Sequence, residues 1–477
     1  MRGISRIFLI TLILTLFIGG CVTKKNPQIS ILNPKNEDIV SGTVNIEVQV
    51  TVDEKNSISS VEFYVDDTKI GTKTQASYTY TCSWNTEGFE TGNHTITVKA
   101  YDNKGNTSSA SINVGKNAFL KWIIGTGYIY ACPAIGDDGT IYVIGSKLYA
   151  INPDGSIKWG KSLENEYFNV QCSPVIGNDG TIYVVSSGDN AQLYAVNPGD
   201  GSTKWSTLIS KLNNHIGNIS LTLDSKGNIY IGNAAGYLYS LDSKGNIRWT
   251  YTCGQGITSY PVVDKDDNIY TFCKNTGSGG VFYSINSDGN YRWSYSFPIN
   301  EWCTAPPSID SEGNIYLPIS SGTYGKIYKY DKEGTLQWTT QVSGNIYYSP
   351  IFDNSGYLYV CDESKNIYKI STNNGSIVES TNIGYHSSLV ISKEGIIYAI
   401  GIDSSKYVIR AIDASDLSIK WNYTAPQTYY TTLSNDGILY FGTLGSELFA
   451  IKVDSTGLMD SPWPKYRKDL KNTGKAD

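Results

Sequence analysis

Alternating apolar and polar residues predict short strands along most of the chain. The segments Ile46–Val50 and Val61–Val65 each place apolar side chains at every second position. A period of two is typical of strands with one buried face, and the clusters of Asn, Asp, Gly and Pro between the runs predict turns. Between residues 28 and 115 the runs are spaced as in a β-sandwich. We therefore expect an all-β fold whose first folded domain spans residues 28–115.

Beyond this domain the strand pattern repeats. A Gly-x-(Ile/Leu)-Tyr motif, with Asp267 in place of the glycine in one copy, recurs at spacings of 39 to 47 residues. Such a period is typical of propeller blades, and each copy has room for the short strands that make up one blade. The motif tyrosines are Tyr142, Tyr183, Tyr230, Tyr270, Tyr316, Tyr359, Tyr398 and Tyr440. We expect residues 117–457 to form an eight-bladed β-propeller.

The ends of the repeat predict how the ring closes. Most copies finish with a strand that ends in Trp, but the eighth copy reaches Ser461 without such a strand. Leu120–Trp122, ahead of the first copy, matches the outer strand Ile157–Trp159. We therefore expect this N-terminal strand to complete the last blade. The rival closure uses Trp463, whose flanking prolines lack the N–H that a strand ladder needs. We expect the tail, residues 458–477, to pack on the propeller.

The N-terminus has the pattern of an export signal. Arg2 and Arg6 precede the apolar run Ile7–Ile18, and Gly19, Gly20 and Cys21 follow. A charged start, a short apolar run and small residues are typical of a signal peptide, and the run is too short to span a bilayer. The segment ending in Cys21 resembles the lipobox of bacterial lipoproteins, which implies lipidation of Cys21. The alternative is an ordinary signal peptide with an incidental cysteine.

This interpretation gives residues 1–21 as the signal segment and 22–27 as a tether. We expect an extracytoplasmic protein that is held by lipid at the cell membrane or the outer membrane. The net charge of −6 gives no electrostatic reason to expect nucleic-acid binding.

Two strings of residues resemble known families. The segment VEFYVDDTKIGT and the residues that follow it resemble bacterial immunoglobulin-like domains, which implies that Trp84 is a core residue. Segments such as DGTIYVIGSKLYAINPDGSIKW resemble pyrroloquinoline-quinone-like (PQQ-like) propeller repeats. That family contains quinoprotein alcohol dehydrogenases as well as the lipoprotein scaffold of the outer-membrane β-barrel assembly machinery. The resemblance to this family is therefore compatible with either an enzyme or a binding protein.

The residues give little support to the enzyme. The resemblance implies a quinone held by a disulfide of adjacent cysteines, with calcium on acidic and amide side chains, but no two of the 8 cysteines are adjacent. The 3 histidines are far apart in the sequence, which gives little support to a histidine metal site or a Ser-His-Asp catalytic triad. A calcium site at Asp264, Asp266 and Asp267 lacks a full ligand set. We predict no cofactor and no metal, and keep a quinoprotein oxidoreductase as the alternative.

Four carboxylates recur at one position of the repeat. They are Asp224, Asp264, Asp310 and Asp353. Recurrence in successive blades indicates a structural role in a turn, because catalysis needs an asymmetric group of residues.

Aromatic residues occur in seven of the eight segments between an outer strand and the next inner strand, and the remaining segment carries His215. These connections should run to one end of the ring, where amphipathic rings suit a protein or a polysaccharide partner. The candidates are Tyr128, Tyr130, Phe168, Tyr260, Trp302, Tyr347, Tyr348, Tyr385, Tyr429 and Tyr430. Trp302 is the best single candidate because it lies outside the repeated Trp position. The alternative is that these rings pack in the core.

The cysteines that remain after Cys21 are odd in number, so at least one has no partner within a monomer. Cys132 and Cys172 lie on neighbouring inner strands in registers that differ by one, which points their side chains to opposite faces. We therefore expect free buried thiols.

Overall fold

A computed structural model gives the structure of the protein. It describes residues 26–476 except 37, 41–42, 87–88, 90–91, 117–118, 163–171, 187–190, 210–220, 255, 275–278, 304 and 385–386. The signal segment and Cys21 lie outside this part of the chain. The described residues form two compact units, one within residues 26–115 and one from Lys116 onward. No helix among them is long and apolar enough to cross a membrane.

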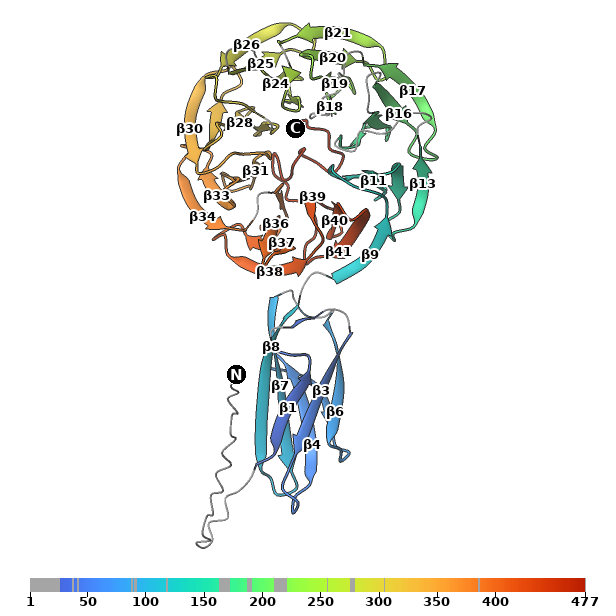
Figure 1. Ribbon diagram of the computed structural model, residues 1–477, viewed down its shortest axis with the longest axis vertical. Helices are drawn as coiled ribbons and strands as arrows, with labels where there is room; N and C mark the ends of the chain where they lie inside the picture. Colours follow the sequence, from blue (N-terminus) through green and yellow to red (C-terminus); the bar gives the residue numbers. More distant parts are fainter. Residues whose placement is uncertain are drawn as a thin grey trace, which may run out of the picture. The chain divides into compact units, whose positions relative to one another are not determined.

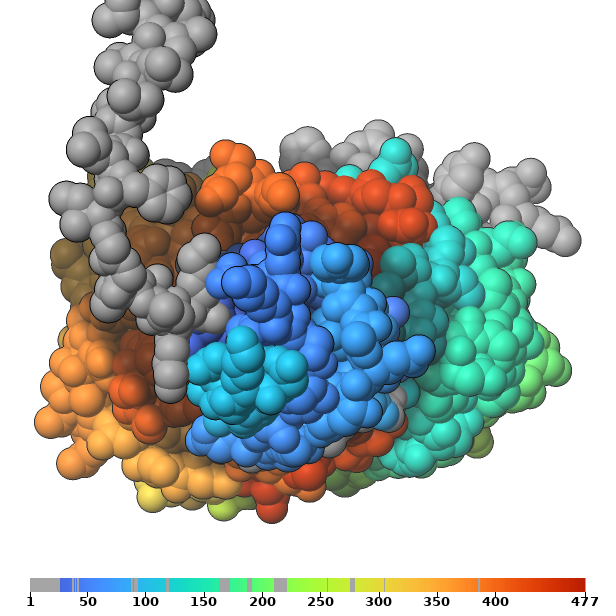
Figure 2. Space-filling view, turned by 90° about the horizontal axis from the view of Figure 1, so that it is seen from below, coloured from blue at the N-terminus to red at the C-terminus, as the bar shows by residue number. Residues whose placement is uncertain are grey.

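The first unit is a β-sandwich, the compact body in blue and cyan in Figure 2. One sheet has the order β1 (Gln28–Asn33), β3 (Thr43–Thr51), β6 (Thr79–Asn85), and the other has the order β2 (Ile39–Val40), β8 (Thr107–Lys116), β7 (Gly92–Asp102), β4 (Ile58–Val65), β5 (Thr68–Lys73). The apolar positions predicted from the alternation, including Ile46, Val48 and Phe63, are buried. Trp84 is buried too, so its expected core role is confirmed.

The second unit is a ring of sheets (Figure 1). Within the described residues it contains eight sheets, which we number as blades 1 to 8 from the first copy of the repeat. Blades 1 to 4 contain β10 (Ala134–Ile135), β11 (Ile141–Ile144), β12 (Leu148–Ile151) and β13 (Ile157–Lys161); β14 (Val175–Ile176), β15 (Ile182–Val185), β16 (Gln192–Val196) and β17 (Thr203–Leu208); β18 (Leu221–Leu223), β19 (Ile229–Gly232), β20 (Tyr237–Leu241) and β21 (Ile247–Thr252); and β22 (Gly256–Ile257), β23 (Val262–Val263), β24 (Ile269–Lys274), β25 (Gly280–Ile285) and β26 (Tyr291–Ser296).

The other half of the ring repeats the same order. Blades 5 to 8 contain β27 (Ser308–Ile309), β28 (Ile315–Ser320), β29 (Gly325–Tyr330) and β30 (Leu336–Val342); β31 (Ile351–Phe352), β32 (Tyr357–Cys361), β33 (Asn366–Ser371) and β34 (Ile377–Asn382); β35 (Val390–Ile391), β36 (Ile396–Asp403), β37 (Lys406–Asp413) and β38 (Ile419–Thr424); and β39 (Thr428–Leu433), β40 (Ile438–Thr443), β41 (Glu447–Lys452) and β9 (Phe119–Gly125). The predicted eight-bladed propeller is therefore confirmed.

The ring closes as the repeat predicts. The outer strand of blade 8 is β9, which comes from the N-terminal end of the propeller and pairs with β41. Trp122 lies opposite Ala450 in this pair. Closure of this kind leaves no unpaired strand between the first and last blades. Trp463, the rival, is fully buried but belongs to no strand of the ring.

The repeated tryptophans join neighbouring blades. The Trp249 Nε1 of blade 3 donates a hydrogen bond to the Ser287 carbonyl in a turn of blade 4, over 3.0 Å. A Cβ on Gly289 of that turn would lie 2.8 Å from the Trp249 ring, and Gly289 has φ +87°. Glycine is therefore required there for both space and conformation. The same arrangement recurs at the seam, where Trp122 of blade 8 donates to the Pro153 carbonyl of blade 1.

The recurring carboxylates shape turns, as predicted. In blade 4 the Asp264 Oδ1 accepts the backbone N–H of Asp266 and of Asn268, and Oδ2 accepts the Tyr270 hydroxyl over 2.8 Å. The other three copies bind their motif tyrosines over 2.8 to 3.0 Å. These four motif tyrosines are thereby fixed in the cores of their blades.

The cysteines differ in part from expectation. Cys132 and Cys172 are free and buried, as predicted. A disulfide joins Cys253, which follows β21 of blade 3, to Cys273 in β24 of blade 4. This pair was missed because β22, a separate short strand ahead of β23, carries the chain alongside the end of β24, and no other blade has such a separate strand among the described residues.

Candidate functional site

The two ends of the ring differ, because antiparallel strands alternate in direction. The connections from each outer strand to the next inner strand lie at one end, which we call the entry face. The turns that follow the innermost strands lie at the opposite end. We call that end the tail face, because the C-terminal tail, here residues 457–476, runs along it.

The tail crosses the innermost strands of most blades. Six of these strands end in a residue whose backbone N–H donates to a tail carbonyl over 2.7 to 3.2 Å. The pairs, donor first, are Phe352 with Trp463, Ile391 with Pro464, Ile135 with Leu470, Ile176 with Lys471, Leu223 with Thr473, and Val263 with Gly474. The C-terminus lies near the centre of the ring in Figure 1. The tail therefore occupies the ring centre from the tail face.

Several polar side chains of the tail are buried in this position. Lys465 is fully buried, and its ammonium group donates to Asn472 Oδ1 over 2.7 Å and to the Asp469 carbonyl over 3.0 Å. Burial lowers the pKa of Lys465. Asn472 Nδ2 donates in turn to the carbonyls of Cys132 and Pro174, which lie just ahead of the inner strands β10 and β14. Sequence reasoning missed these roles, because a run rich in Lys and Arg is most often solvated.

Three of the candidate aromatics lie together against the tail. Tyr260, Tyr348 and Tyr430 come from blades 4, 6 and 8 and surround Tyr466 of the tail. Ring centroids lie 6.2 Å apart for Tyr260 and Tyr466, and 5.0 Å apart for Tyr430 and Tyr466. Burial raises the pKa of Tyr430 and of Tyr466 well above the ordinary value. Tyr260, Tyr348 and Tyr466 are buried and Tyr430 is half-buried, so the rings hold the tail at the ring centre rather than forming an open stacking surface.

The other candidates are more accessible. Tyr128 is 58% exposed, and Tyr130, Trp302, Tyr347 and Tyr429 are half-buried. Phe168 and Tyr385 lie outside the described residues. Tyr128, Tyr130, Trp302 and Tyr347 precede inner strands, and Tyr429 lies at the start of the inner strand β39, so all five lie toward the entry face.

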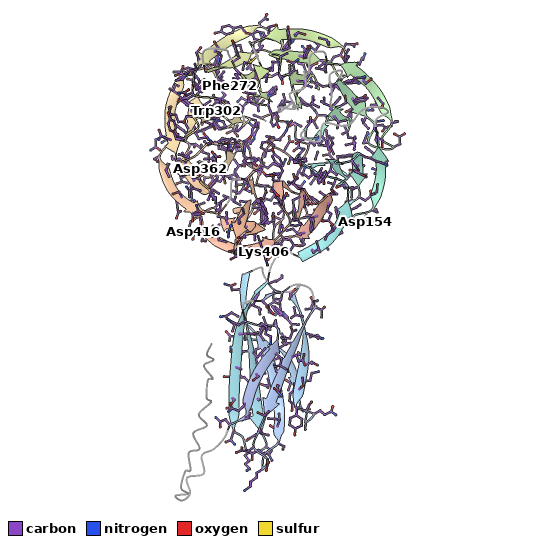
Figure 3. All side chains as sticks on the ribbon, viewed as in Figure 1. Asp154, Phe272, Trp302, Asp362, Lys406 and Asp416 are labelled. Carbon is purple, nitrogen blue, oxygen red and sulfur yellow. A yellow bond between two sulfur atoms is a disulfide. The ribbon has the colours of Figure 1, made fainter. Side chains whose placement is uncertain are left out.

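Two of them, Trp302 and Tyr347, are linked through Gly322 and Asn345 on blades 5 and 6. Trp302 exchanges backbone hydrogen bonds with Ser320 at the end of β28 (Figure 3). Its ring lies 3.4 Å from the position of a Cβ on Gly322, whose N–H donates to Asn345 Oδ1 over 2.9 Å. The aromatic patch, as we call it, consists of Trp302, Asn345, Tyr347 and Glu363.

Hydrogen bonds order the polar centre of the aromatic patch. Asn345 Nδ2 donates to Glu363 Oε2 over 2.8 Å, and the Tyr347 hydroxyl approaches the same oxygen at 3.3 Å. Burial and the Glu363 charge raise the pKa of Tyr347. Asn345 is buried and Glu363 is exposed. The patch thus offers two aromatic rings beside an ordered amide and carboxylate, which is a surface for stacking and hydrogen bonding.

The residue before Trp302 belongs to an ion pair between the buried Glu301 and the half-buried Lys326. The carboxylate of the preceding residue, Glu301, accepts from Lys326 Nζ over 2.6 Å and from the Tyr328 hydroxyl over 3.1 Å. Hydrogen bonding to Glu301 raises the pKa of Lys326. Breaking this pair would leave a buried charge without its partner, so the pair holds the segment that carries Trp302 in place.

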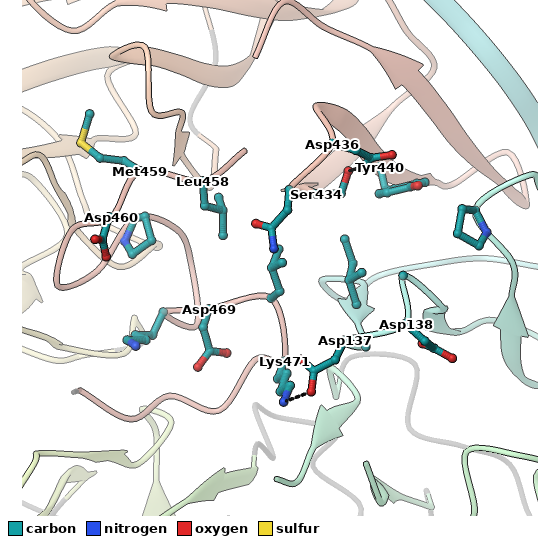
Figure 4. A pocket seen from close by; sticks show the side chains of 18 of the residues that line it. Asp137, Asp138, Ser434, Asp436, Tyr440, Leu458, Met459, Asp460, Asp469 and Lys471 are labelled. Carbon is teal, nitrogen blue, oxygen red and sulfur yellow. Dashed lines mark hydrogen bonds and ion pairs between the residues drawn. The ribbon is translucent and has the colours of Figure 1, made fainter. Parts of the chain in front are cut away.

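A pocket lies on the tail face where the ring closes. This seam pocket has a volume of about 610 Å³ and lies between the turn Gly136–Gly139 of blade 1, the turn Ser434–Asp436 of blade 8 and the tail (Figure 4). Its polar lining includes Asp137, whose carboxylate accepts from Lys471 Nζ over 2.8 Å. Sequence reasoning did not find it, because it forms only when the first and last blades meet.

The described residues do not fit the quinone site that the family resemblance implies. The disulfide joins two cysteines that are 20 positions apart, and it does not provide adjacent cysteines. No group of three or more His, Cys, Asp or Glu side chains in the described part of the chain could hold a metal ion.

The fold defines the chain as a β-propeller protein with an N-terminal immunoglobulin-like sandwich. A model of the bacterial Ig domain matches residues 27–98. The model described as outer membrane protein assembly factor BamB matches residues 95–294, 210–423 and 323–457, which together cover most of the chain. The chain therefore belongs to the BamB family.

Solved structures share the propeller. The crystal structure of BamB from Moraxella catarrhalis has a TM-score of 0.56 at 11% identity, over 70% of this chain and all of that one. The Dos1 propeller gives 0.56 at 11% identity, over 72% of this chain and 97% of that one. The computationally designed Ika8 protein gives 0.54 at 12% identity, over 71% and 100%. Identities this low show the fold alone. Among curated proteins, none matches the chain.

Proposed function

We propose that this protein is a lipid-anchored, extracytoplasmic scaffold that binds a protein partner at the entry face of its propeller. One observation carries the proposal. The tail and its tyrosine cluster occupy the ring centre from the tail face, whereas Tyr128, Trp302 and Tyr347 remain accessible toward the entry face. Accessible aromatics beside ordered polar groups are typical of protein interfaces. Membership of the BamB family supports a scaffold over an enzyme.

The anchor is tested separately from the binding. Cells that express the protein are fed a labelled fatty acid, and we expect the label on the wild-type protein and its loss in Cys21→Ala. The variant should also move from the membrane fraction to the soluble fraction. Equal labelling of both proteins would exclude Cys21 as the lipid site.

Site-specific crosslinking in living cells tests the binding face. A photoreactive phenylalanine analogue is placed at Tyr128, at Tyr347 and, as a control, at Lys244, an exposed residue in a turn at the other end of blade 3. We expect one discrete adduct from the two entry-face positions, reduced by Trp302→Ala, and none from Lys244. Equal yields from all three positions would refute binding at the entry face. Thermal unfolding of each variant shows that the fold is kept.

A polysaccharide is the second candidate partner. The aromatic patch favours it, because Trp302 and Tyr347 lie beside the ordered Asn345 and Glu363, and sugar rings take both stacking and hydrogen bonds. Affinity electrophoresis in gels that contain cell-wall or plant polysaccharide tests this candidate. Retardation of the wild-type protein but not of Trp302→Ala would support a glycan. Identical mobility of both in all gels would exclude it.

A further inference from the structure

We propose that the seam pocket is a second binding site, which takes a short peptide segment with an apolar side chain beside a lysine or arginine. The proposal does not depend on the entry face, because the pocket lies at the opposite end of the ring. It would make the propeller a connector with one partner on each face.

Apolar residues make up part of the lining of the seam pocket. Six apolar residues from blade 1, a neighbouring turn and the tail line it, namely Ile135, Pro153, Leu458, Met459, Pro464 and Leu470. The volume of about 610 Å³ falls within the roughly 300–1,000 Å³ of pockets that take small ligands. A few side chains of a peptide therefore fit, and a folded domain does not.

The rim of the seam pocket is acidic. Its lining includes five aspartates and two lysines, so the carboxylates are in excess. The aspartates are Asp137, Asp138, Asp436, Asp460 and Asp469. Asp137 is paired with Lys471, as the dashed line in Figure 4 marks, and Asp138 is paired with Lys158 over 3.3 Å, which leaves Asp436, Asp460 and Asp469 against Lys468 in the lining. An excess of negative charge at the mouth of an apolar pocket attracts a cationic group and repels an anionic one, which selects a basic segment.

The walls of the seam pocket are fixed before any ligand arrives. The Ile135 N–H donates to the Leu470 carbonyl over 2.7 Å, and the Met459 N–H donates to the Ile391 carbonyl over 3.0 Å. The tail is thereby hydrogen-bonded to blade 1 on one side of the cavity and to blade 7 on the other. A preformed site avoids the entropic cost of ordering its walls on binding.

Binding of defined peptides to the detergent-solubilised full-length protein tests the proposal. The probe is a short fluorescent peptide of alternating leucine and lysine, compared with one that has glutamate for lysine and one that has serine for leucine. Fluorescence anisotropy reports the affinity. We expect binding of the first peptide alone, weakened by added salt. No binding of it, or equal binding of all three, would overturn the proposal.

Charge reversals locate the site. Asp460 is exposed in the pocket rim, and Asp460→Lys should weaken binding about five- to tenfold, as expected for loss and reversal of a rim charge. The matched control is Glu333→Lys, the same change at an exposed turn residue of blade 5. Met459→Glu tests the apolar wall and should abolish binding. Equal affinities of the two charge reversals would overturn the assignment.

An entry-face variant separates the two proposals. Trp302→Ala should leave binding of the leucine–lysine peptide unchanged, even if it abolishes crosslinking at the entry face. A loss of peptide binding in Trp302→Ala would place the peptide at the entry face and refute the seam pocket as its site.

Discussion

Removal of the Trp122 side chain should weaken the closure of the ring. Its ring packs against Tyr440 of its own blade with 5.7 Å between centroids, and Nε1 donates to the Pro153 carbonyl of blade 1 over 2.9 Å. A Cβ on Gly155 of blade 1 would lie 2.8 Å from the same ring. Trp122 thus carries the contact between the strand that completes the last blade and the first blade.

The expected cost follows from burial and hydrogen bonding. Truncation of a fully buried Trp to Ala costs about 3–5 kcal/mol, and Trp122 is half-buried, so about 2 kcal/mol is expected for the ring. The hydrogen bond adds about 1 kcal/mol. Trp122→Ala should therefore lower the free energy of unfolding by about 3 kcal/mol. Urea unfolding followed by far-ultraviolet circular dichroism measures it, because this signal does not depend on the removed indole.

A matched variant separates closure from packing. Trp249→Ala removes the equivalent contact between blades 3 and 4, with a hydrogen bond of 3.0 Å to Ser287. Both variants should lose similar stability, but only Trp122→Ala should speed amide hydrogen exchange in β9 and β41, where the first strand of the propeller can separate from the last blade. A loss below about 1 kcal/mol for Trp122→Ala, beside a full loss for Trp249→Ala, would refute the idea that β9 holds the ring closed.

Three further predictions concern stability. Gly289→Ala should cost about 2 kcal/mol in urea unfolding, because alanine must adopt a positive φ and its Cβ would meet an indole ring. Reduction of the disulfide, or the Cys253→Ser and Cys273→Ser pair, should cost about 3 kcal/mol for a loop of this length, seen as a lower Tm. Burial alone would raise the pKa of Glu394, but hydrogen bonds from Thr456 outweigh it and lower that pKa to about 2. The stability from a lowered carboxyl pKa is complete above about pH 4.5 and is lost as the pH falls toward 2, so Glu394→Gln should flatten the acid side of a Tm-against-pH curve.

The sequence predicted the ring because the same residue types recur at the same positions in each copy of the repeat. Each blade needs a buried tyrosine and an acid or glycine in the turn before it, and these choices are local. The closing strand was visible because Trp122 copies the outer-strand pattern. The position of each blade then follows from order along the chain.

The path of the tail could not be predicted in the same way. The tail contacts inner strands up to several hundred positions away, and its backbone is irregular, with positive φ at Arg467, Lys468 and Asn472. No period or alternation indicates such a path. Tyr260, Tyr348 and Tyr430 were named from the same signal as Trp302, but all three pack with Tyr466 of the tail, where Tyr260 and Tyr348 are buried and Tyr430 is half-buried.

The exception in blade 6 shows what the repeat requires. Glu379 stands where other copies have Trp, yet the next blade still receives a donor in the equivalent turn. Lys369 on the neighbouring strand, opposite Glu379, donates to the carbonyls of Ala414 and Ser415 over 2.9 and 2.8 Å. In blade 5 the Thr372 carbonyl accepts from two donors, Trp338 Nε1 over 3.1 Å and Lys329 Nζ over 3.0 Å, and Lys329 lies opposite Trp338 as Lys369 lies opposite Glu379. The requirement is therefore a donor that reaches the next turn, and a comparison of residue types at the Trp position misses the lysine on the adjacent strand, which still donates when the Trp is absent.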